Sequence, residues 1–224
     1  MNHLEKENSV CAIIPFYNEE KNLTKLVNEV LNFVDFIIAV DDGSTDNSLQ
    51  QVSKIKNVII EKHETNLGKG AALKTGFIKS IELKTNYTLT IDADLQHAPE
   101  FIPKFIESLI VKDCAIGNRL HNQKDMPLIR RTSNFITSKM LSIKTSERIL
   151  DSQSGYRAFK TKILKDILPN FTGFEAESEM IVKLVRKNYS LSFVNIPAIY
   201  TEDDDSKMKA VPAILGFIKV ILTV

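Results

Sequence analysis

The sequence predicts an α/β protein with a mostly parallel sheet and helices on both faces. Short continuous apolar runs, typical of strands covered on both sides, alternate with segments whose apolar residues recur at helical spacing. Several of these runs end in polar turns, which is where ligands bind in open α/β sheets. No repeat, linker or low-complexity segment interrupts the alternation, and 224 residues suffice for one domain with a substantial core.

The elements are expected in the following order. The apolar runs predict strands at residues 10–16, 36–40, 58–60, 87–91, 114–117, 158–159 and 191–196. Apolar residues at helical spacing predict helices at 23–31, 66–81 and 99–109, and from 174 through 185. The turn at 41–46 carries capping residues and predicts a further helix after it. Residues 121–150 are basic, contain Ser and Thr, and have too weak an apolar stripe for an element to be assigned.

Composition narrows the class of protein. The apolar and charged fractions, 43% and 25%, are ordinary for a globular protein, and the net charge of +1 gives no global field for nucleic acid. Cys11 and Cys114 adjoin apolar runs and are expected to pack as small buried hydrophobes in a reducing compartment. No spacing typical of a zinc site is present. Because the first residues are polar, with no apolar core of a signal peptide, the protein is expected on the cytosolic side.

The most informative pattern is the pair Asp92 and Asp94, which directly follows the strand expected at 87–91. Carboxylates are rarely buried unless they are paired or bind a metal. Their oxygens suit Mg²⁺ or Mn²⁺, which usually complete their shell with waters and substrate phosphates. The alternative is a solvated turn with two acidic residues. The glycines at 66–70 could let the backbone approach a phosphate, although the spacing is not that of a P-loop.

Together these motifs resemble a known family. Ile-Ile-Pro-Phe-Tyr-Asn-Glu-Glu at 13–20, Val-Asp-Asp-Gly-Ser-Thr-Asp at 40–46 and Asp-Ala-Asp-Leu-Gln-His-Ala-Pro-Glu at 92–100 look like a family 2 glycosyltransferase of the GT-A fold. Within that family the chain is most similar to polyprenyl-phosphate sugar synthases of the dolichyl-phosphate mannose synthase type. Asn-x-Gly-Lys-Gly at 66–70, Gly-Asn-Arg at 117–119, Asp-Ser-Gln-Ser-Gly-Tyr-Arg at 151–157 and Glu-x-Glu-Met at 177–180 extend the likeness over about 9–207.

The resemblance implies a site for the nucleotide-diphosphate sugar, the donor. Pro15, Tyr17 and Glu19 would line the pocket for base and ribose, with Val40 and Asp42 opposite; the alternative for Asp42 is a capping turn. Mg²⁺ or Mn²⁺ would bridge the diphosphate. The residues that the resemblance implies around this metal and the diphosphate are Asp92, Ala93, Asp94 and Gln96.

Basic residues are implied as phosphate ligands. Arg119 would meet donor phosphate, and Arg130 or Arg131, with Arg157, would bind phosphate of donor or acceptor, because guanidinium groups suit that role. A solvated surface charge is the alternative for each. Lys69, with Asn66, is interpreted as the start of a helix. His97 either touches substrate or is a polar residue beside a helix.

Glu177 and Glu179 are the candidate catalytic bases, although acidic residues also favour helix N-termini for electrostatic reasons. A base is needed if the acceptor is a hydroxyl, whereas the phosphate of a lipid acceptor is already ionised at neutral pH. The expected acceptor is a polyprenyl phosphate, and a sugar hydroxyl of a cell-surface glycan is the alternative. The resemblance implies inversion at the anomeric carbon.

The C-terminal part departs from the mannose synthases. Ser206-Lys207 is retained and Lys207 would reach the diphosphate, but Thr201 replaces a basic residue, which argues against GDP-mannose as donor. Residues 1–207 are expected to form the catalytic domain and 208–224 an apolar segment too short to span a bilayer. It would lie on the membrane surface, pack on the core or a second subunit, or be the stub of a missing span. A peripheral contact at the cytoplasmic face suits a lipid acceptor.

Two other classes fit less well. A sugar-nucleotide nucleotidyltransferase usually begins with a phosphate loop rich in Gly and basic residues, and residues 11–20 contain neither. A binding module without activity would be expected to lose the Asp92–Asp94 motif, the pocket around Glu19 or the bend at 151–157, and this chain has all of them.

Overall fold

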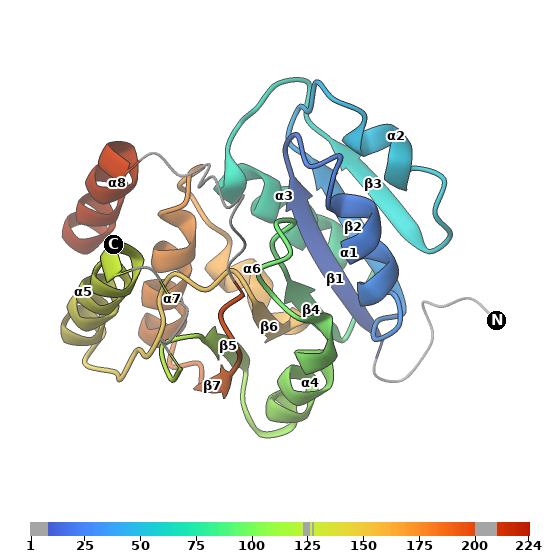
Figure 1. Cartoon of the computed structure of the whole chain (residues 1–224). Helices are drawn as coiled ribbons and strands as arrows, with labels where there is room; N and C mark the ends of the chain where they lie inside the picture. The colour runs from blue at the N-terminus through green and yellow to red at the C-terminus, as the bar shows by residue number, and fades with distance from the viewer. Residues whose placement is uncertain (1–8, 123–125, 127, 200–209) are drawn as a thin grey trace.

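The computed structural model describes residues 9–122, 126, 128–199 and 210–224, and Figure 1 shows the whole chain. Its sheet has seven strands in the order β3-β2-β1-β4-β6-β5-β7. β6 runs antiparallel to its neighbours β4 and β5, and the other pairs are parallel, so the expected mostly parallel sheet is confirmed. The strands are β1 Val10–Phe16, β2 Phe36–Asp41, β3 Val58–Lys62, β4 Tyr87–Thr90, β5 Cys114–Asn118, β6 Arg157–Lys160 and β7 Leu191–Asn195.

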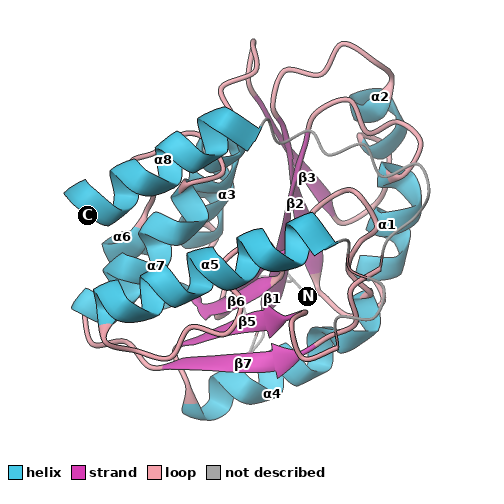
Figure 2. Ribbon diagram, turned by 60° about the vertical axis from the view of Figure 1, so that its left-hand side comes forward, coloured by secondary structure: helices cyan, strands magenta, loops and turns pink. Residues whose placement is uncertain are grey.

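Helices cover both faces of the sheet, as predicted (Figure 2). On one face lie α1 Leu23–Val30, α2 Ser48–Val52 and α4 Ile102–Val111, the last preceded by a 3₁₀ turn at Pro99–Phe101. On the other lie α3 Lys69–Glu82, α5 Leu128–Thr145, α6 Leu164–Ile167 after a 3₁₀ turn at Thr161–Ile163, α7 Ala176–Arg186 and α8 Ala210–Thr223.

Strand periodicity explains how one chain builds two apolar cores. Successive side chains of a strand point to opposite faces, so in β1 Cys11 and Ile13 join the core under α3, whereas Ala12 and Ile14 join the core under α1 and α4. The cysteines are free and buried, as predicted. Burial raises the pKa of the Cys11 thiol to about 11, so this thiol stays protonated at neutral pH.

α5 is the main element that the sequence did not predict. Its buried positions include Asn134 and Ser138, which are polar, while Phe135 and Ile143 are 61% and 72% exposed. Hydroxyl groups along the helix donate to carbonyl oxygens four residues earlier, as Ser142 Oγ does to Ser138 O at 2.8 Å. Most apolar residues of α5 face outward, and Leu141 is the exception among its described residues, buried in the core. The sequence therefore shows only a weak apolar stripe for this helix.

α8 packs on α5 and α7 through Phe217 and Val220, both buried in the core. Leu215 and Leu222 lie on its exposed side. Among the described residues, no helix combines the length and the apolar character needed to cross a bilayer.

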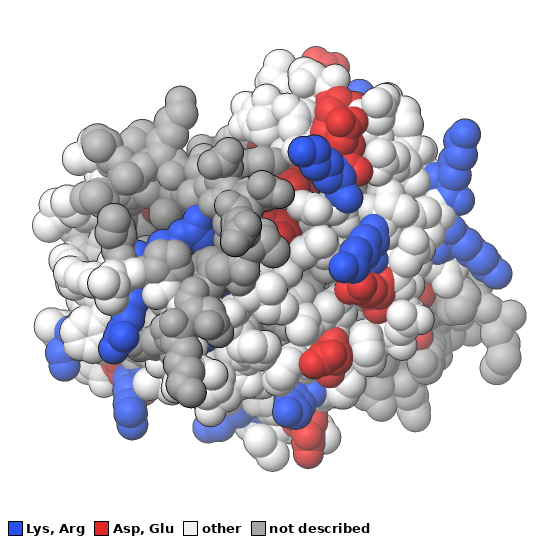
Figure 3. Space-filling view, viewed as in Figure 1, with Lys and Arg blue, Asp and Glu red and all other residues white. Residues whose placement is uncertain are grey.

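Charged side chains are unevenly distributed over the face in Figure 3. Most of the acidic side chains in this view lie over the half of the molecule that holds α1 and α2, where they alternate with basic ones, while the side that holds α5 and α8 shows mainly basic side chains.

Candidate active site

The polar motifs meet because they follow neighbouring parallel strands. β2, β1 and β4 are adjacent, with Phe16 opposite Asp41 and Ile13 opposite Thr90. The turns that follow these strands therefore lie at one edge of the sheet, the position where ligands bind in open α/β folds. The structure thus brings the motifs at 13–20, 40–46 and 92–100 together, as their placement after strands predicts.

The turns after β1 and β2 are tied to each other. Asn18 adopts a left-handed conformation with φ 53°, its N–H donates to Ser44 Oγ at 3.0 Å, and its Oδ1 accepts from Thr45 N at 2.8 Å. The Glu19 N–H donates to Ser48 Oγ at 2.8 Å. Of the expected donor-pocket residues, Pro15 and Val40 are buried and paired in register, and Tyr17 and Glu19 are partly exposed at the edge. Ala93 is buried.

Asp42 is held by protein groups. Its Oδ1 accepts from Leu67 N at 2.9 Å and lies 2.7 Å from His63 Nδ1, and its Oδ2 accepts from Gly68 N at 2.8 Å. This carboxylate therefore fixes the loop that starts α3. Gly68 has φ 100°, and a Cβ there would lie 2.5 Å from Thr172 O, so this loop requires glycine.

The preceding carboxylate differs. Asp41 is completely buried, and its Oδ1 accepts from Ser44 N at 2.8 Å. Its Oδ2 is buried with no hydrogen-bond partner among the described residues. An unsatisfied buried acceptor is costly, so Asp41 is suited to receive an N–H from a ligand at this edge. The sequence motif instead predicted that Asp42 contacts the nucleotide sugar.

Lys69 lies at the centre of the site, which the sequence did not predict. As expected it begins α3, but its Nζ is 2.7 Å from Asp92 Oδ1 and 3.1 Å from Glu177 Oε1. Burial alone would lower the pKa of Lys69, but the two carboxylates outweigh it and raise this pKa above its usual range. The ammonium thus joins three elements: the end of β4, the start of α3 and the start of α7.

Asp92 is held on its other side by a glycine and a histidine. A Cβ on Gly155 would lie 2.2 Å from Asp92 Oδ2, so the bend at 151–157 leaves room for this carboxylate. His97 is buried, and its Nε2 is 3.9 Å from the same oxygen. Burial would raise the pKa of Asp92, but Lys69 and then His97 lower it. Burial lowers the pKa of His97 to about 4 against the pull of Asp92, so His97 is neutral at pH 7.

Asp94 and Gln96 occupy the partly exposed turn beyond Asp92. Asp94 Oδ1 accepts from Gln96 N at 3.0 Å, and Leu95 between them has φ 61°. Among the described residues, no three His, Cys, Asp or Glu side chains gather closely enough to enclose a metal. The carboxylates of Asp92 and Asp94 fit a hard cation that takes one or two carboxylates from the protein and its other ligands from phosphate and water.

The buried arginines stabilise the bend at 151–157. Arg119 pairs with the buried Asp151, with Nε 2.8 Å from Oδ2 and NH2 3.0 Å from Oδ1. Burial would raise the pKa of Asp151, but Arg119 lowers it. Arg157 uses all its guanidinium nitrogens on backbone carbonyl oxygens: those of Ser152, Ser154 and Glu177. Arg130 and Arg131 lie on α5, the former partly and the latter fully exposed.

The two candidate bases have different surroundings. Glu177 is buried in the Lys69–Asp92 cluster. Glu179 is buried against the loop before α7, where its Oε2 accepts from Asn170 N at 2.8 Å and Phe171 N at 3.0 Å. Its other oxygen pairs with Lys183 at 2.8 Å. None of these partners belongs to the cluster around Asp92. Lys207 lies outside the described residues.

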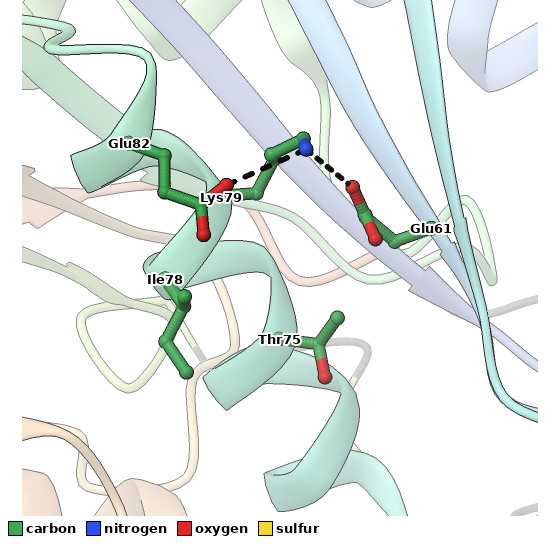
Figure 4. A pocket seen from close by; sticks show the side chains of 5 residues that line it. All are labelled: Glu61, Thr75, Ile78, Lys79 and Glu82. Atoms are coloured by element: carbon green, nitrogen blue, oxygen red, sulfur yellow. Dashed lines mark hydrogen bonds and ion pairs between the residues drawn. The ribbon is translucent and has the colours of Figure 1, made fainter.

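A separate pocket of about 230 Å³ is lined by residues of α3 and by Glu61 of the edge strand β3 (Figure 4). In it Lys79 bridges two carboxylates, with Nζ 3.0 Å from Glu61 and 3.4 Å from Glu82. Thr75 and Ile78 complete its lining. This lysine has the same kind of partners as Lys69 but lies in a more exposed setting.

Comparison with known proteins agrees with this geometry. The model of Glycosyl transferase family 2 matches residues 11–168. The UDP-N-acetylglucosamine–dolichyl-phosphate N-acetylglucosaminyltransferase of Methanococcus voltae is 36% identical over 86% of this chain and 86% of its own length. The undecaprenyl-phosphate 4-deoxy-4-formamido-L-arabinose transferase of Proteus mirabilis is 29% identical over 75% of this chain and 54% of its own length.

A solved structure shares the fold. Glucosyl-3-phosphoglycerate synthase from Mycobacterium tuberculosis, in complex with Mn²⁺, uridine diphosphate and phosphoglyceric acid, superposes with a TM-score of 0.76 at 17% identity. The superposition covers 97% of this chain and 78% of that one. The sheet and this shared fold are of the GT-A type, and the matched family model makes the chain a glycosyltransferase. The chain belongs to Glycosyl transferase family 2, which confirms the family expected from the motifs.

The close approach of Gly155 to Asp92 gives a first testable prediction. Gly155→Ala is expected to lower donor turnover by about a hundredfold, because the new methyl group displaces a carboxylate that must be placed accurately. The free energy of unfolding should fall by about 1 to 3 kcal/mol, because Lys69 holds the carboxylate that the methyl group displaces. Steady-state kinetics and thermal unfolding check both parts. Gly216→Ala in α8, whose Cβ would meet the end of Glu175 at 2.9 Å, is the matched control with unchanged turnover.

Proposed function

We propose that this glycosyltransferase moves a sugar from a nucleoside diphosphate sugar to a polyprenyl phosphate. The names of the curated relatives support this acceptor class, since they include dolichyl-phosphate and undecaprenyl-phosphate transferases. The structural observation that carries the proposal is the pairing of both candidate bases: Lys69 holds Glu177 and Lys183 holds Glu179. In each pair the ammonium holds one oxygen of the carboxylate, which ties the side chain to a protein partner and away from a hydroxyl acceptor. An acceptor that is already ionised needs no such base.

The donor would lie along the turns after β1, β2 and β4. Pro15, Tyr17 and Glu19, with Val40 and Asp42 on the next strand, are proposed to form the base and ribose pocket. Asp41 is added to this set because of its unpaired buried oxygen. Asp42 would act by holding the loop at 66–68 rather than by direct contact, since both of its oxygens already have partners.

Asp94 and Gln96, with Asp92, are proposed to hold Mg²⁺ or Mn²⁺, and Ala93 places the two carboxylates on the turn. A bound divalent cation supplies electrostatic stabilisation for the charge that develops on the leaving diphosphate. The glucosyl-3-phosphoglycerate synthase structures, which hold Mn²⁺ or Mg²⁺ with uridine diphosphate, support this choice of cofactor. Lys69 keeps Asp92 ionised and fixed in place without the metal.

In the transfer, a phosphate oxygen of the acceptor forms a bond to the anomeric carbon. The bond from that carbon to the donor diphosphate breaks, and the nucleoside diphosphate leaves with the electron pair. Attack opposite the leaving group inverts the configuration. Arg119 would stabilise the phosphates, positioned by Asp151, with Lys207 as a further cation. Arg130 or Arg131 would bind acceptor phosphate. Arg157 would act indirectly, by fixing the bend at 151–157 to the start of α7.

A lipid acceptor places the reaction at a membrane surface. We propose a peripheral contact at the cytoplasmic face, where nucleotide sugars are available. The net charge of +1 gives no support for nucleic acid as a partner.

The test is transfer by the purified full chain with Mn²⁺, with UDP- and GDP-sugars screened in the presence and absence of a short-chain polyprenyl phosphate. Turnover of one donor that requires the lipid phosphate is the expected result. Glu177→Gln should then retain most of the activity, because no base is needed. Turnover that is the same with and without the lipid, together with a loss of transfer activity of about a hundredfold or more in Glu177→Gln, would instead establish a hydroxyl acceptor with Glu177 as its base.

A further inference from the structure

The outer side of α5 carries apolar residues that the fold leaves uncovered. Phe135, Ile136 and Ile143 are exposed on this helix, and Leu215, Ile218 and Leu222 are exposed on α8. The two helices lie side by side in Figures 1 and 2, and Lys144 Nζ of α5 donates to Ile221 O of α8 at 2.8 Å. We call these six apolar residues and the two helices that carry them the α5–α8 face. Apolar patches of this kind mark interaction sites.

The charges around this face indicate what covers it. The sequences of α5 and α8 contain no Asp or Glu, and their charged residues are all basic: Arg130, Arg131, Lys139, Lys144 and Lys219. Apolar residues flanked by lysine and arginine are typical of helices that lie in the interface of an anionic bilayer. Contact between two copies of this face would bring the basic residues of these helices together, and neither helix carries an acidic side chain to pair with them.

We propose that the α5–α8 face docks on an anionic bilayer, with both helices in contact with the membrane surface. The biological purpose of this docking rests on the proposed polyprenyl phosphate acceptor. Its evidence does not: it consists of the exposed apolar residues and the basic residues that flank them. It differs from an anchor formed by the C-terminal segment alone, because α5 contributes half of the surface and lies inside the catalytic domain.

The inner side of α5 connects this surface to the active site. The Ser152 N–H donates to Ser138 Oγ at 2.9 Å, and Ile149 N–H donates to Ser142 Oγ at 3.0 Å. Ser152 belongs to the bend at 151–157, which also holds Arg119 through Asp151 and leaves room for Asp92 at Gly155. A bilayer in contact with α5 is therefore connected to the bend at 151–157 through these hydrogen bonds, and that bend shapes the site. This explains why the polar face of α5 points inward.

The test is sedimentation of the full chain with vesicles of phosphatidylcholine alone, or with phosphatidylglycerol added to about one part in three. The wild-type chain should bind the anionic vesicles and bind the neutral ones more weakly. Phe135→Glu/Ile143→Glu should bind at least about tenfold more weakly, since each change removes apolar contact and adds repulsion. Leu215→Glu/Leu222→Glu is a second variant with the same expectation, should the first fail to fold.

The matched control is Ile110→Glu/Val111→Glu, because these residues of α4 are equally exposed but lie on the opposite face of the sheet. Vesicle binding that this control loses to the same degree, or wild-type binding that is absent, overturns the proposal. The proposal is also overturned if sedimentation velocity shows that the wild-type chain is a dimer, that the α5 variant is a monomer, and that neither binds vesicles.

Transfer to a short-chain acceptor in solution separates the two hypotheses. Loss of vesicle binding with unchanged transfer supports the docking face. Vesicle binding without any transfer to a lipid phosphate leaves the docking face standing and overturns the proposed acceptor.

Discussion

Asp94→Ala is expected to reduce metal-dependent donor turnover by about a thousandfold while leaving the fold intact. The reason is that Asp94 is the partly exposed carboxylate of the Asp92–Asp94 pair, at the turn where a diphosphate and a hard cation would meet. Removing it leaves no equivalent anion on that turn. Turnover at increasing Mn²⁺ should show the loss, and thermal unfolding should stay close to that of the wild type because the turn is at the surface.

Asp94→Asn separates charge from local structure. The amide oxygen can still accept the Gln96 N–H that Asp94 Oδ1 accepts at 3.0 Å, so the turn is preserved while the negative charge is lost. We expect this variant to be as inactive as Asp94→Ala and to bind Mn²⁺ more weakly in a titration without donor. Activity that survives both substitutions and is indifferent to EDTA would rule out the metal.

The strands could be predicted because each is a short apolar run covered on both faces. The run 10–16 is a clear case: alternate side chains enter different cores, so nearly every position must be apolar. α5 could not be predicted in the same way. Its inner face is satisfied mainly by hydrogen bonds that Ser138 and Ser142 accept from the backbone N–H groups of Ser152 and Ile149, in the segment that follows the helix, and less by apolar packing.

The location of the site was predictable for a similar reason. Polar turns after adjacent parallel strands meet at one edge, so Asp92 and the Tyr17 turn had to come together once the sheet was parallel. Which side chains act directly was less predictable. Arg157 and Asp42 have the residue types that bind ligands, but folding directs them to backbone groups that the sequence does not reveal.

Two partners of Asp92 had weak signals in the sequence. Lys69 lies between two glycines, a pattern that frees its backbone to approach other segments, but nothing local indicates that its side chain reaches Asp92 and Glu177. Gly155 is notable only once Asp92 lies against it. Both depend on contacts between residues that are far apart in the chain, and a single sequence carries no record of such contacts.

Lys69→Met is expected to lower the free energy of unfolding by about 3 kcal/mol or more and to impair transfer. Methionine keeps most of the length of the side chain, so packing is largely retained, but two carboxylates that shared one ammonium are left together in a mostly buried setting. Breaking a buried pair by removing one partner is costly because the remaining charge has no compensation. Chemical denaturation measures the stability, and steady-state kinetics measures the transfer.

A second substitution tests whether charge is the cause. Glu177→Gln introduced into Lys69→Met removes one of the two uncompensated carboxylates, so part of the lost stability should return, as a favourable coupling in a double-mutant cycle. Transfer should stay impaired, because Asp92 has still lost the ammonium that fixes it.

The matched control is Lys79→Met. Lys79 is on the same helix and also lies between two carboxylates, Glu61 and Glu82, but it is open to water (Figure 4). Water and salt already screen that pair, so its loss should change stability and transfer little. A control as damaging as Lys69→Met, or a double variant less stable than Lys69→Met alone, would show that Lys69 acts by packing and not as the counter-ion of the site.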